Sequence, residues 1–371
     1  VGIAQAESTP ERSITQRIES CDVLVIGLGP AGASAAAEAA VQGARVIAVD
    51  RKINAGVPVQ CAEFVPRMLG MEIADLACAR RQDIASMATF LDAGLPDVEP
   101  HFPGMMIDRA AFDAKLVANA CALGAQCRFN TKLHTFSADG SAQFSDGTTI
   151  TATVVIGADG PRSRVGSAVG APNTELVETR QITVPLLCPH NSTDIFLSSD
   201  IPGGYAWLFP KGDLANLGLG VAPQWRAELK PLLEKLHAQL RDEGRVGDEV
   251  SGYTGGAIPV GGMRRLVSQI AETNVLLAGD AAGLTNPVTG AGIAAAVISG
   301  RAAGAAAASL ICKNASAADE YSDEMESMFG PSLARALARR RALMAIYKSG
   351  VVPGRNELKR SWIAFPEYWA A

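Results

Sequence analysis

Two side chains that can exchange protons lie close together in the segment VPVQCAEFVP, residues 57–66. Cys61 provides a thiol and Glu63 a carboxylate, and enzymes use both groups as general acids or bases. Pro58 and Pro66 restrict the backbone on either side, which predicts a rigid, partly extended loop. Cys61 and Glu63 are therefore our candidate catalytic residues, although a buried, inert thiol is the alternative for Cys61.

The composition disfavours two other kinds of site. The four histidines are scattered and no two of the seven cysteines form a C-x-x-C pair, so no metal site is predicted. The formal net charge is −5 and no dense Lys/Arg run is present, which speaks against a nucleic-acid-binding protein. The odd number of cysteines fits no simple disulfide framework, so we expect reduced thiols and a cytoplasmic location.

A strand–helix–strand unit precedes the loop and would position it. Residues 21–26 read as a short apolar strand, residues 30–42 as a helix and residues 45–49 as a second strand. The turn between the first strand and the helix carries G-x-G-x-x-G, and an acid follows the second strand; these residues are Gly27, Gly29, Gly32 and Asp50. This combination is the fingerprint of dinucleotide binding.

Each residue of the fingerprint has a physical reason. The first glycine permits the tight turn, the second lets the backbone approach a pyrophosphate, and the third lets the helix pack on the strand. The pyrophosphate would lie at the positive end of the helix, and Asp50 would accept hydrogen bonds from a ribose, with Arg51 beside it. The motif alone does not separate NAD from FAD.

Two later segments, residues 155–165 and 274–300, resemble the FAD-binding fold of the para-hydroxybenzoate hydroxylase class. Each segment begins with an apolar strand. The first strand runs into an Asp-Gly pair and the second into a Gly-Asp pair. The resemblance implies FAD as cofactor and carries over to Asp159, Gly160, Gly279 and Asp280, and to a loop at the flavin ring with Pro287, Gly290 and Gly292. It also implies an arginine near FAD, here Arg109, whose alternative is a helix-capping surface residue.

The middle of the chain reads as a different kind of structure. Between residues 176 and 264, short apolar stretches alternate with polar residues, which predicts a mainly antiparallel sheet. Residues 225–243 show leucines on one face and predict an amphipathic helix. Residues 290–312 have the length of a membrane span, but they are rich in Ala and Gly and contain Arg301, so a buried helix is the better interpretation and no transmembrane segment is expected.

One stretch of this sheet, GGYAWLFPKGDLANLGLGV, resembles the aromatic motif of the geranylgeranyl reductase family. Tyr205, Trp207 and Phe209 alternate and would share one sheet face, where they would either line a substrate cavity or fill an interface. The family also has a Pro-x-x-Cys loop after the second strand, which Pro58 to Cys61 matches. The resemblance covers roughly residues 21–310 and implies a loop that reaches both flavin and substrate.

In its Cys-Ala-Glu-Phe loop at residues 61–64 and its FPEYWA tail at residues 365–370, the chain also looks like a branch of this family that helps to make tryptophylquinone cofactors. That likeness implies an FAD-dependent monooxygenase whose partner is a protein substrate carrying the target tryptophan. The alternatives are an FAD-dependent reductase that saturates prenyl (geranylgeranyl) double bonds and a non-catalytic flavin-binding maturation chaperone. Because no second dinucleotide domain is visible, NAD(P)H would bind transiently or another external electron donor would reduce the flavin.

These expectations combine into an α/β fold class. An FAD-binding Rossmann-like domain would be formed by residues 21–175 and 265–312, with an inserted, mainly antiparallel β-sheet substrate domain at 176–264. A polar N-terminal arm, residues 1–20, would precede them, and a C-terminal helical segment, residues 313–371, would follow.

Overall fold

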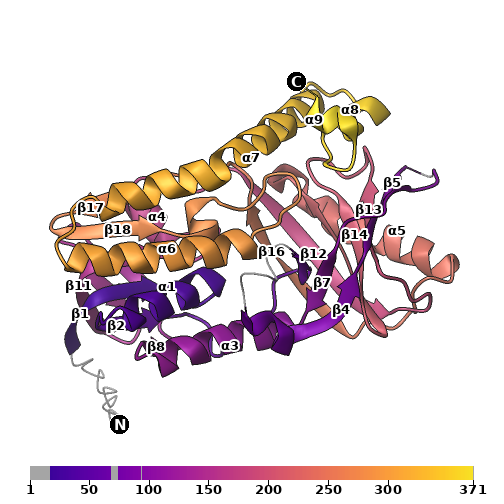
Figure 1. Ribbon diagram of the computed structural model, residues 1–371. Coiled ribbons are helices and arrows are strands. Elements are labelled where there is room, and N and C mark those ends of the chain that lie inside the picture. Colours follow the sequence, from indigo (N-terminus) through magenta and orange to yellow (C-terminus); the bar gives the residue numbers. More distant parts are fainter. Residues whose placement is uncertain (1–16, 68–73, 93, 371) are drawn as a thin grey trace, which may run out of the picture.

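The computed structural model describes residues 17–67, 74–92 and 94–370, which form a mixed α/β fold with several sheets (Figure 1). The first sheet has a parallel centre in which β11 pairs with β1 and β1 with β2. In spatial order its strands are β17 (Val267–Ile270), β18 (Thr273–Leu277), β11 (Thr148–Gly157), β1 (Arg17–Ile26), β2 (Val46–Val49) and β8 (Gln126–Arg128), and β10 (Ala142–Phe144) and β9 (Leu133–Phe136) extend from β11. The fold class expected from the sequence is confirmed.

The first strand begins earlier than the sequence predicted. Residues 17–20 continue β1 and pair with residues 148–151 of β11, so the expected arm does not reach residue 20. The polar side chains of this extension are mostly exposed, which is why the apolar pattern did not reveal it. Residues 1–16 lie outside the described part of the chain.

Four helices lie side by side against this sheet (Figure 1). In chain order they are α1 (Pro30–Val41), α3 (Arg109–Ala122), α6 (Ile293–Ile311) and α7 (Ala317–Lys348). α1 packs between α3 and α6, and α7 packs on α6. The short helix α4 (Arg164–Ala168) follows β11, and the single turn η3 (Gly279–Ala282) follows β18.

The small residues of α6 let it lie directly against α1. A Cβ atom at Gly300 would lie 2.2 Å from the carbonyl oxygen of Ala31, and one at Gly304 would lie 2.5 Å from that of Ala35. By length and composition α6 could cross a membrane, but 56% of its most apolar window is buried inside the protein. The glycine and alanine content is therefore explained by close helix packing.

The second sheet is mainly antiparallel, as predicted. Its spatial order is β16 (Gly252–Pro259), β12 (Leu176–Pro185), β15 (Leu214–Val221), β14 (Ala206–Lys211), β13 (Ser192–Leu197), β5 (Ser86–Leu91) and β6 (Asp97–Glu99). The sequence placed residues 86–99 with the FAD-binding part, whereas β5 joins β13 in a parallel pair. Partners more than 100 residues apart leave no local pattern, so the sequence could not indicate this pairing.

The two faces of the second sheet have different neighbours. On one face, Ala206 and Leu208 pack with leucines of α5 (Leu229–Asp242), which follows the turn η2 (Pro223–Glu228). On the other face, Trp207 and Phe209 join a second apolar cluster. The alternation of side chains along β14 therefore assigns each of them to the correct face of the sheet. The leucines predicted on one face of residues 225–243 belong to the hydrophobic core.

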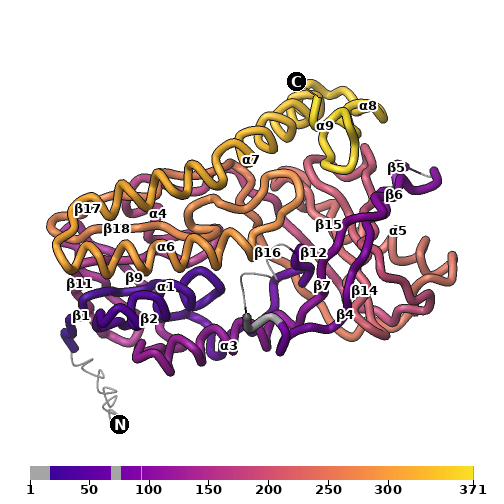
Figure 2. Tube along the Cα trace, in the orientation of Figure 1, coloured from indigo at the N-terminus to yellow at the C-terminus, as the bar shows by residue number. Residues whose placement is uncertain are grey.

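Two further units join the halves of the molecule. A small sheet of β3 (Phe64–Pro66), β7 (Gly104–Ile107) and β4 (Arg80–Ile84) lies next to η1 (Ala74–Ala79) and β14. Helix α7 runs along the first sheet and continues past the second one to α8 (Arg355–Arg360) and α9 (Pro366–Trp369) (Figure 2). The C-terminal segment thus contacts both halves.

Candidate functional site

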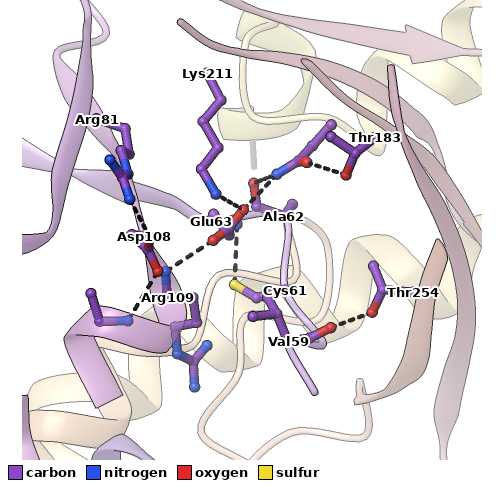
Figure 3. Close-up of polar contacts among 12 residues, drawn as sticks. Val59, Cys61, Ala62, Glu63, Arg81, Asp108, Arg109, Thr183, Lys211 and Thr254 are labelled. Carbon is purple, nitrogen blue, oxygen red and sulfur yellow. Dashed lines mark hydrogen bonds and ion pairs between the residues drawn. The ribbon is translucent and has the colours of Figure 1, made fainter. Parts of the chain in front are cut away.

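The loop that carries Cys61 ends on a buried carboxylate between the start of α3 and the second sheet (Figure 3). Glu63 has a left-handed backbone, with φ of 70°, and its side chain is buried. Its Oε1 accepts a hydrogen bond of 2.9 Å from the backbone N–H of Arg109, at the start of α3. Its Oε2 accepts from Lys211 Nζ at 2.6 Å and from Asn216 Nδ2 at 2.9 Å, on β14 and β15.

These contacts favour an anchoring role for Glu63 over proton transfer. Three donors from three separate elements occupy the carboxylate, and one of them is the ammonium group of Lys211. The pair is mostly shielded from water, with 6% of the Glu63 side chain and 20% of the Lys211 side chain exposed. We therefore interpret Glu63 as the residue that fixes the end of the loop.

Cys61 is half-buried and its thiol lies beside a cation. Its Sγ accepts a hydrogen bond of 3.1 Å from the backbone N–H of Glu63. Burial disfavours charge on the Arg109 guanidinium, but Asp113 and the neighbouring Cys61 sulfur outweigh that effect, and the pKa of Arg109 is raised. Arg109 also forms an ion pair of 2.7 Å with Asp113. The thiol is thus held at the partly exposed side of the loop, next to a permanent positive charge.

A chain of hydrogen bonds ties the loop to the aromatic strand. Gln181 Nε2 donates to the carbonyl oxygen of Cys61 at 3.2 Å, and Gln181 Oε1 accepts from Trp207 Nε1 at 2.9 Å. Asn216 Nδ2 also lies 3.3 Å from the carbonyl oxygen of Ala62. The position of the thiol therefore depends on the second sheet as well as on the loop itself.

The dinucleotide fingerprint has the geometry that its glycines require. Gly27 has a positive φ of 100°, and a Cβ atom at Gly32 would lie 1.7 Å from the carbonyl oxygen of Gly27. By contrast, no described atom lies within 4 Å of a Cβ atom at Gly29. Among the described residues no side chain caps α1, so the backbone N–H groups at its N-terminus stay available to a pyrophosphate.

Asp50, the acid after the second strand, is hydrogen-bonded to the glycine turn between β1 and α1. Asp50 is buried, and its Oδ2 accepts from the backbone N–H of Leu28 at 2.7 Å, while its Oδ1 accepts from that of Lys52 at 2.8 Å. Because a carboxylate can accept about four hydrogen bonds, both oxygens retain capacity for a ribose diol. Arg51 is exposed. The cofactor-binding roles of these residues stay predictions.

We expect Gly29→Ala to weaken FAD binding at least about tenfold, because the added methyl would project into the space that the pyrophosphate of FAD occupies. The apoprotein should be as stable as the wild type, because the methyl would touch no other described part of the protein. Isothermal titration of apoprotein with FAD and thermal unfolding of the apoprotein measure the two effects. Gly32→Ala is the matched control, since its methyl would meet the Gly27 carbonyl and should reduce stability itself. Unchanged FAD affinity in Gly29→Ala would contradict the placement of the pyrophosphate.

A second group of cofactor candidates surrounds the start of α6. Asp280 is partly buried, and its Oδ1 accepts from Thr285 Oγ1 at 2.6 Å. Burial raises the pKa of Asp280, and Thr285 and Arg109 oppose that rise. Among the described residues no donor bonds to its other oxygen, Oδ2, which leaves an acceptor for a hydroxyl such as that of a ribityl chain.

The loop before α6 is shaped by its glycines. Gly279 and Gly290 have positive φ values of 60° and 70°. A Cβ atom at Gly292, the residue before α6, would lie 2.7 Å from Thr285 Oγ1. No side chain among the described residues caps α6, so this helix N-terminus could face an anionic group.

Asp159 has a local role that the sequence did not indicate. Its Oδ1 accepts from Ser163 Oγ at 2.5 Å, and its Oδ2 accepts from the backbone N–H of Arg164 at 2.7 Å, so the carboxylate caps α4. Burial raises the pKa of Asp159, and these bonds oppose the rise. Gly160 follows with a φ of 84° and open space beside it. Asp159 thus shapes the turn, and contact with FAD stays a prediction for both residues.

A narrow cavity lies between the aromatic strand and the loop before α6. It has a volume of about 30 Å³, room for about two water molecules, so a larger ligand requires side chains to move. The lining is mostly apolar and consists of Val177, Thr179, Gly204, Tyr205, Trp207, Gly220, Ile258, Val260, Pro287, Val288, Gly290 and Arg340. Tyr205 Oη donates to the carbonyl oxygen of Thr289 at 2.5 Å and joins the two walls.

The three predicted aromatic residues gather on one face but differ in role. Tyr205 and Trp207 line the cavity, whereas Phe209 packs in the adjacent apolar cluster. Trp362, from the C-terminal segment, lies 4.7 Å from Tyr205 between ring centroids. The two interpretations from the sequence, a cavity wall and an interface, are therefore both partly correct.

Sequence reasoning missed Lys211, Asn216, Gln181, Arg340 and Trp362. Lys211 and Asn216 lie 148 and 153 residues from the carboxylate that they bind. The only signal near them was their position within the aromatic stretch. Arg340 belongs to a run of three arginines that reads as an exposed helix face, and only the fold shows that its middle member is buried.

Comparison with protein families gives two matches along the chain. Residues 20–188 match an FAD binding domain, and residues 178–255 match a geranylgeranyl reductase catalytic domain. The two matches overlap at residues 178–188, which include most of β12 of the second sheet. FAD is therefore the cofactor of this fold, and the enzyme is an FAD-dependent oxidoreductase.

Several relatives are similar to this chain over most of their length. A digeranylgeranylglycerophospholipid reductase of Methanocella arvoryzae is 33% identical over 341 residues, which cover 84% of each chain. Digeranylgeranylglycerophospholipid reductase 2 of Methanosphaera stadtmanae is 34% identical over 322 residues and 78% of each chain.

Solved structures share the fold. A geranylgeranyl bacteriochlorophyll reductase-like protein of Thermoplasma acidophilum aligns with a TM-score of 0.81 and 24% identity, covering 92% of this chain and 90% of the other. A probable FAD-dependent monooxygenase of Pseudomonas aeruginosa aligns with a TM-score of 0.69 and 19% identity, covering 92% and 98%. The fold is thus common to proteins described as reductases and as monooxygenases.

These comparisons overturn the main functional prediction from the sequence. We expected a monooxygenase that hydroxylates a tryptophan of a partner protein, on the branch that makes tryptophylquinones. The matched catalytic domain is that of geranylgeranyl reductase, and the two similar proteins are named digeranylgeranylglycerophospholipid reductases. The prediction rested on the loop at residues 61–64 and the tail at residues 365–370, whereas the two relatives match 84% and 78% of the chain.

Proposed function

Because the chain belongs to the geranylgeranyl reductase-like family of FAD-binding oxidoreductases, we propose that it saturates carbon–carbon double bonds in the prenyl chains of a lipid. This reaction was the alternative that the sequence left open. The observation that carries the proposal is the joining of the Cys61 loop, through Gln181 and Trp207, to the wall of an apolar cavity. The loop that carries the thiol is thus bonded to the wall of an apolar, aromatic-lined cavity, and such a cavity suits an alkene.

The reaction adds two hydrogens to one double bond. Reduced FAD, when bound, supplies a hydride to one carbon of the alkene. The other carbon needs a proton, and we assign its transfer to the Cys61 thiol, with Sγ as the donor atom. Glu63 holds the loop in place, and Arg109 stabilises the thiolate that remains after the proton has left.

The cavity wall orients the prenyl chain. Trp207 and Tyr205 offer flat apolar surfaces, and aromatic residues of this kind bury large areas of apolar ligand. The loop with Pro287 and Gly290 forms the opposite wall and leads into α6. An alkene held between these walls would lie next to both the flavin-binding loop and the strand that positions Cys61.

An anaerobic single-turnover experiment tests the proposal. The FAD of the purified protein is reduced chemically and mixed, without oxygen, with a geranylgeranyl lipid or with its fully saturated counterpart. We expect the absorbance of oxidised flavin to return with the unsaturated lipid and to stay absent with the saturated one. Reoxidation that requires oxygen and is indifferent to the lipid would contradict the proposal.

We expect Trp207→Phe to keep FAD bound and to lower the rate of alkene reduction about fivefold, the value of one hydrogen bond of about 1 kcal/mol. The phenyl ring retains the apolar wall but cannot donate to Gln181, so the backbone of Cys61 is held less firmly. Flavin content and the rate of lipid-dependent reoxidation are measured on the same preparation. A lost flavin complement with an unaltered rate per bound flavin would show that Trp207 only supports folding.

The electron donor and the cellular location stay proposals. NAD(P)H or another external donor would reduce the flavin. A cytoplasmic location is consistent with the reduced state expected for the seven cysteines.

A further inference from the structure

A single buried arginine interrupts the apolar lining of the cavity. Arg340, on α7, is 9% exposed and is among the residues that line the cavity. Its Nη1 donates to the carbonyl oxygen of Gly203 at 2.7 Å. A guanidinium has five N–H donors, and within the described residues this is the one hydrogen bond that the group makes.

The charge of Arg340 has no carboxylate bound to it in the described part of the chain. Burial lowers the pKa of Arg340 to about 10, and Glu175 partly opposes the shift. The guanidinium therefore stays protonated at neutral pH. Glu175 instead forms an ion pair of 2.6 Å with Arg341. An unpaired buried cation is costly, and a bound anion would offset the cost.

The neighbouring arginines show that this arrangement is particular to one side chain. Arg339 donates to backbone carbonyl oxygens of the C-terminal segment, and the Arg341 side chain is 57% exposed. Only the middle residue of the run turns into the cavity. Its hydrogen bond to Gly203, three residues before β14 begins, places the guanidinium next to the segment that leads into the aromatic strand.

We propose that Arg340 binds the anionic headgroup of the prenyl substrate, a phosphate ester, and selects such substrates over neutral prenyl alcohols. This inference rests on the proposed function and adds the residue that recognises the polar end of the lipid. Arginine suits the task because its planar fork matches the oxygens of a phosphate. The apolar lining between Val177, Ile258 and Trp207 would then receive the prenyl chain.

The spacing along the strand connects this headgroup site to the reacting thiol. Gly203, which is bonded to Arg340, precedes Trp207 by four residues, a span of no more than about 14 Å. Trp207 is linked through Gln181 to Cys61. A phosphate at Arg340 would thus place the first few isoprene units of the chain, rather than its far end, next to the Cys61 loop.

Binding and turnover of two matched compounds test this inference. Geranylgeranyl phosphate and geranylgeraniol differ only in the anionic group, and each is titrated into oxidised holoenzyme and assayed with reduced holoenzyme. The variants are Arg340→Gln, Arg340→Lys and Arg340→Met, with Arg339→Gln as the matched control on the same helix. Inorganic phosphate is titrated in parallel, because a free anion offers the same oxygens as a headgroup.

We expect wild type to bind the phosphate at least about tenfold more tightly than the alcohol, and Arg340→Gln to lose this preference, since charge-assisted hydrogen bonds exceed neutral ones in strength. Arg340→Lys should retain part of the preference, and Arg340→Met should match Arg340→Gln. Affinity for the alcohol and FAD content should stay within about twofold of wild type in each folded variant. Arg339→Gln should behave as wild type with both compounds.

The outcomes separate this inference from the proposed function. Equal binding of both compounds by wild type, or an equal loss of both in Arg340→Gln and Arg340→Met, would overturn the headgroup role and leave a purely structural one. Arg340-dependent binding without reduction of either compound would support the headgroup site and contradict the reductase. Binding of inorganic phosphate that is lost in Arg340→Gln would support an anion site at Arg340 and show that binding there does not require the prenyl chain.

Discussion

Cys61→Ser should lower the rate of alkene reduction by on the order of 10²-fold or more and leave reduction of the flavin by its electron donor unchanged. The expected size is the usual contribution of general acid catalysis, and a serine hydroxyl is a far weaker acid than a thiol. The serine keeps the approximate volume of the side chain, so the loop, Glu63 and the link to Gln181 should stay in place. Stopped-flow measurement of the two half-reactions separates the effects.

The control for this prediction is Cys312→Ser, which replaces an exposed thiol at the end of α6. It should leave both half-reactions as in wild type. Equal loss in both half-reactions of Cys61→Ser would show a disturbed flavin site, and an unimpaired substrate half-reaction would make Cys61 a packing residue. Either result would remove the thiol from the proposed chemistry.

Lys211→Met should destabilise the protein by about 3 kcal/mol, the lower end of the cost of breaking a buried ion pair, because the lysine is 20% exposed. The loss leaves the carboxylate of Glu63 buried without its cation, while Asn216 and the N-terminus of α3 still donate to it. Urea unfolding of the holoenzyme at fixed FAD concentration gives the change in the free energy of unfolding.

Two comparisons make this prediction specific. Lys235→Met breaks an exposed ion pair with Asp200 and should cost less than about 1 kcal/mol. The double variant Lys211→Met with Glu63→Gln should recover part of the loss, since the amide carries no charge to compensate. If the losses of unfolding free energy in Lys211→Met and Glu63→Gln simply added in the double variant, the ion pair between the two residues would not anchor the loop.

The parts of the fold that follow from local patterns were predictable. The strand, glycine turn and helix of residues 21–42 are contiguous, and each residue type has one structural reason to be there. The same holds for Trp207 and Phe209, whose alternation with Ala206 and Leu208 assigns them to one face. These inferences needed neighbours in sequence only.

The arrangement around Glu63 was not predictable in the same way. Its partners come from three elements, and their residue types are common on exposed surfaces. A lysine near Pro210 reads as an ordinary strand end until the fold brings it to a buried carboxylate. For the same reason the middle arginine of residues 339–341 reads as one of three exposed charges, although helix α7 buries it.

The functional error has a chemical origin. Proteins described as reductases and as monooxygenases share this fold, so the fold that identifies FAD as the cofactor does not identify the reaction. What differs is the fate of the reduced flavin, which depends on the proton donor and on the shape of the substrate cavity. The sequence shows Cys61 but does not show that it is tied to an apolar cavity.

The mass of the lipid product tests the central claim most directly. Chemically reduced holoenzyme is mixed with a geranylgeranyl phospholipid, once without oxygen and once in air, and the lipid is analysed by mass spectrometry. The account predicts a gain of two hydrogens for each reduced double bond, in amounts equal to the reduced flavin, and without any need for oxygen. A lipid of unchanged mass, or a product that has gained oxygen only in air, would contradict it.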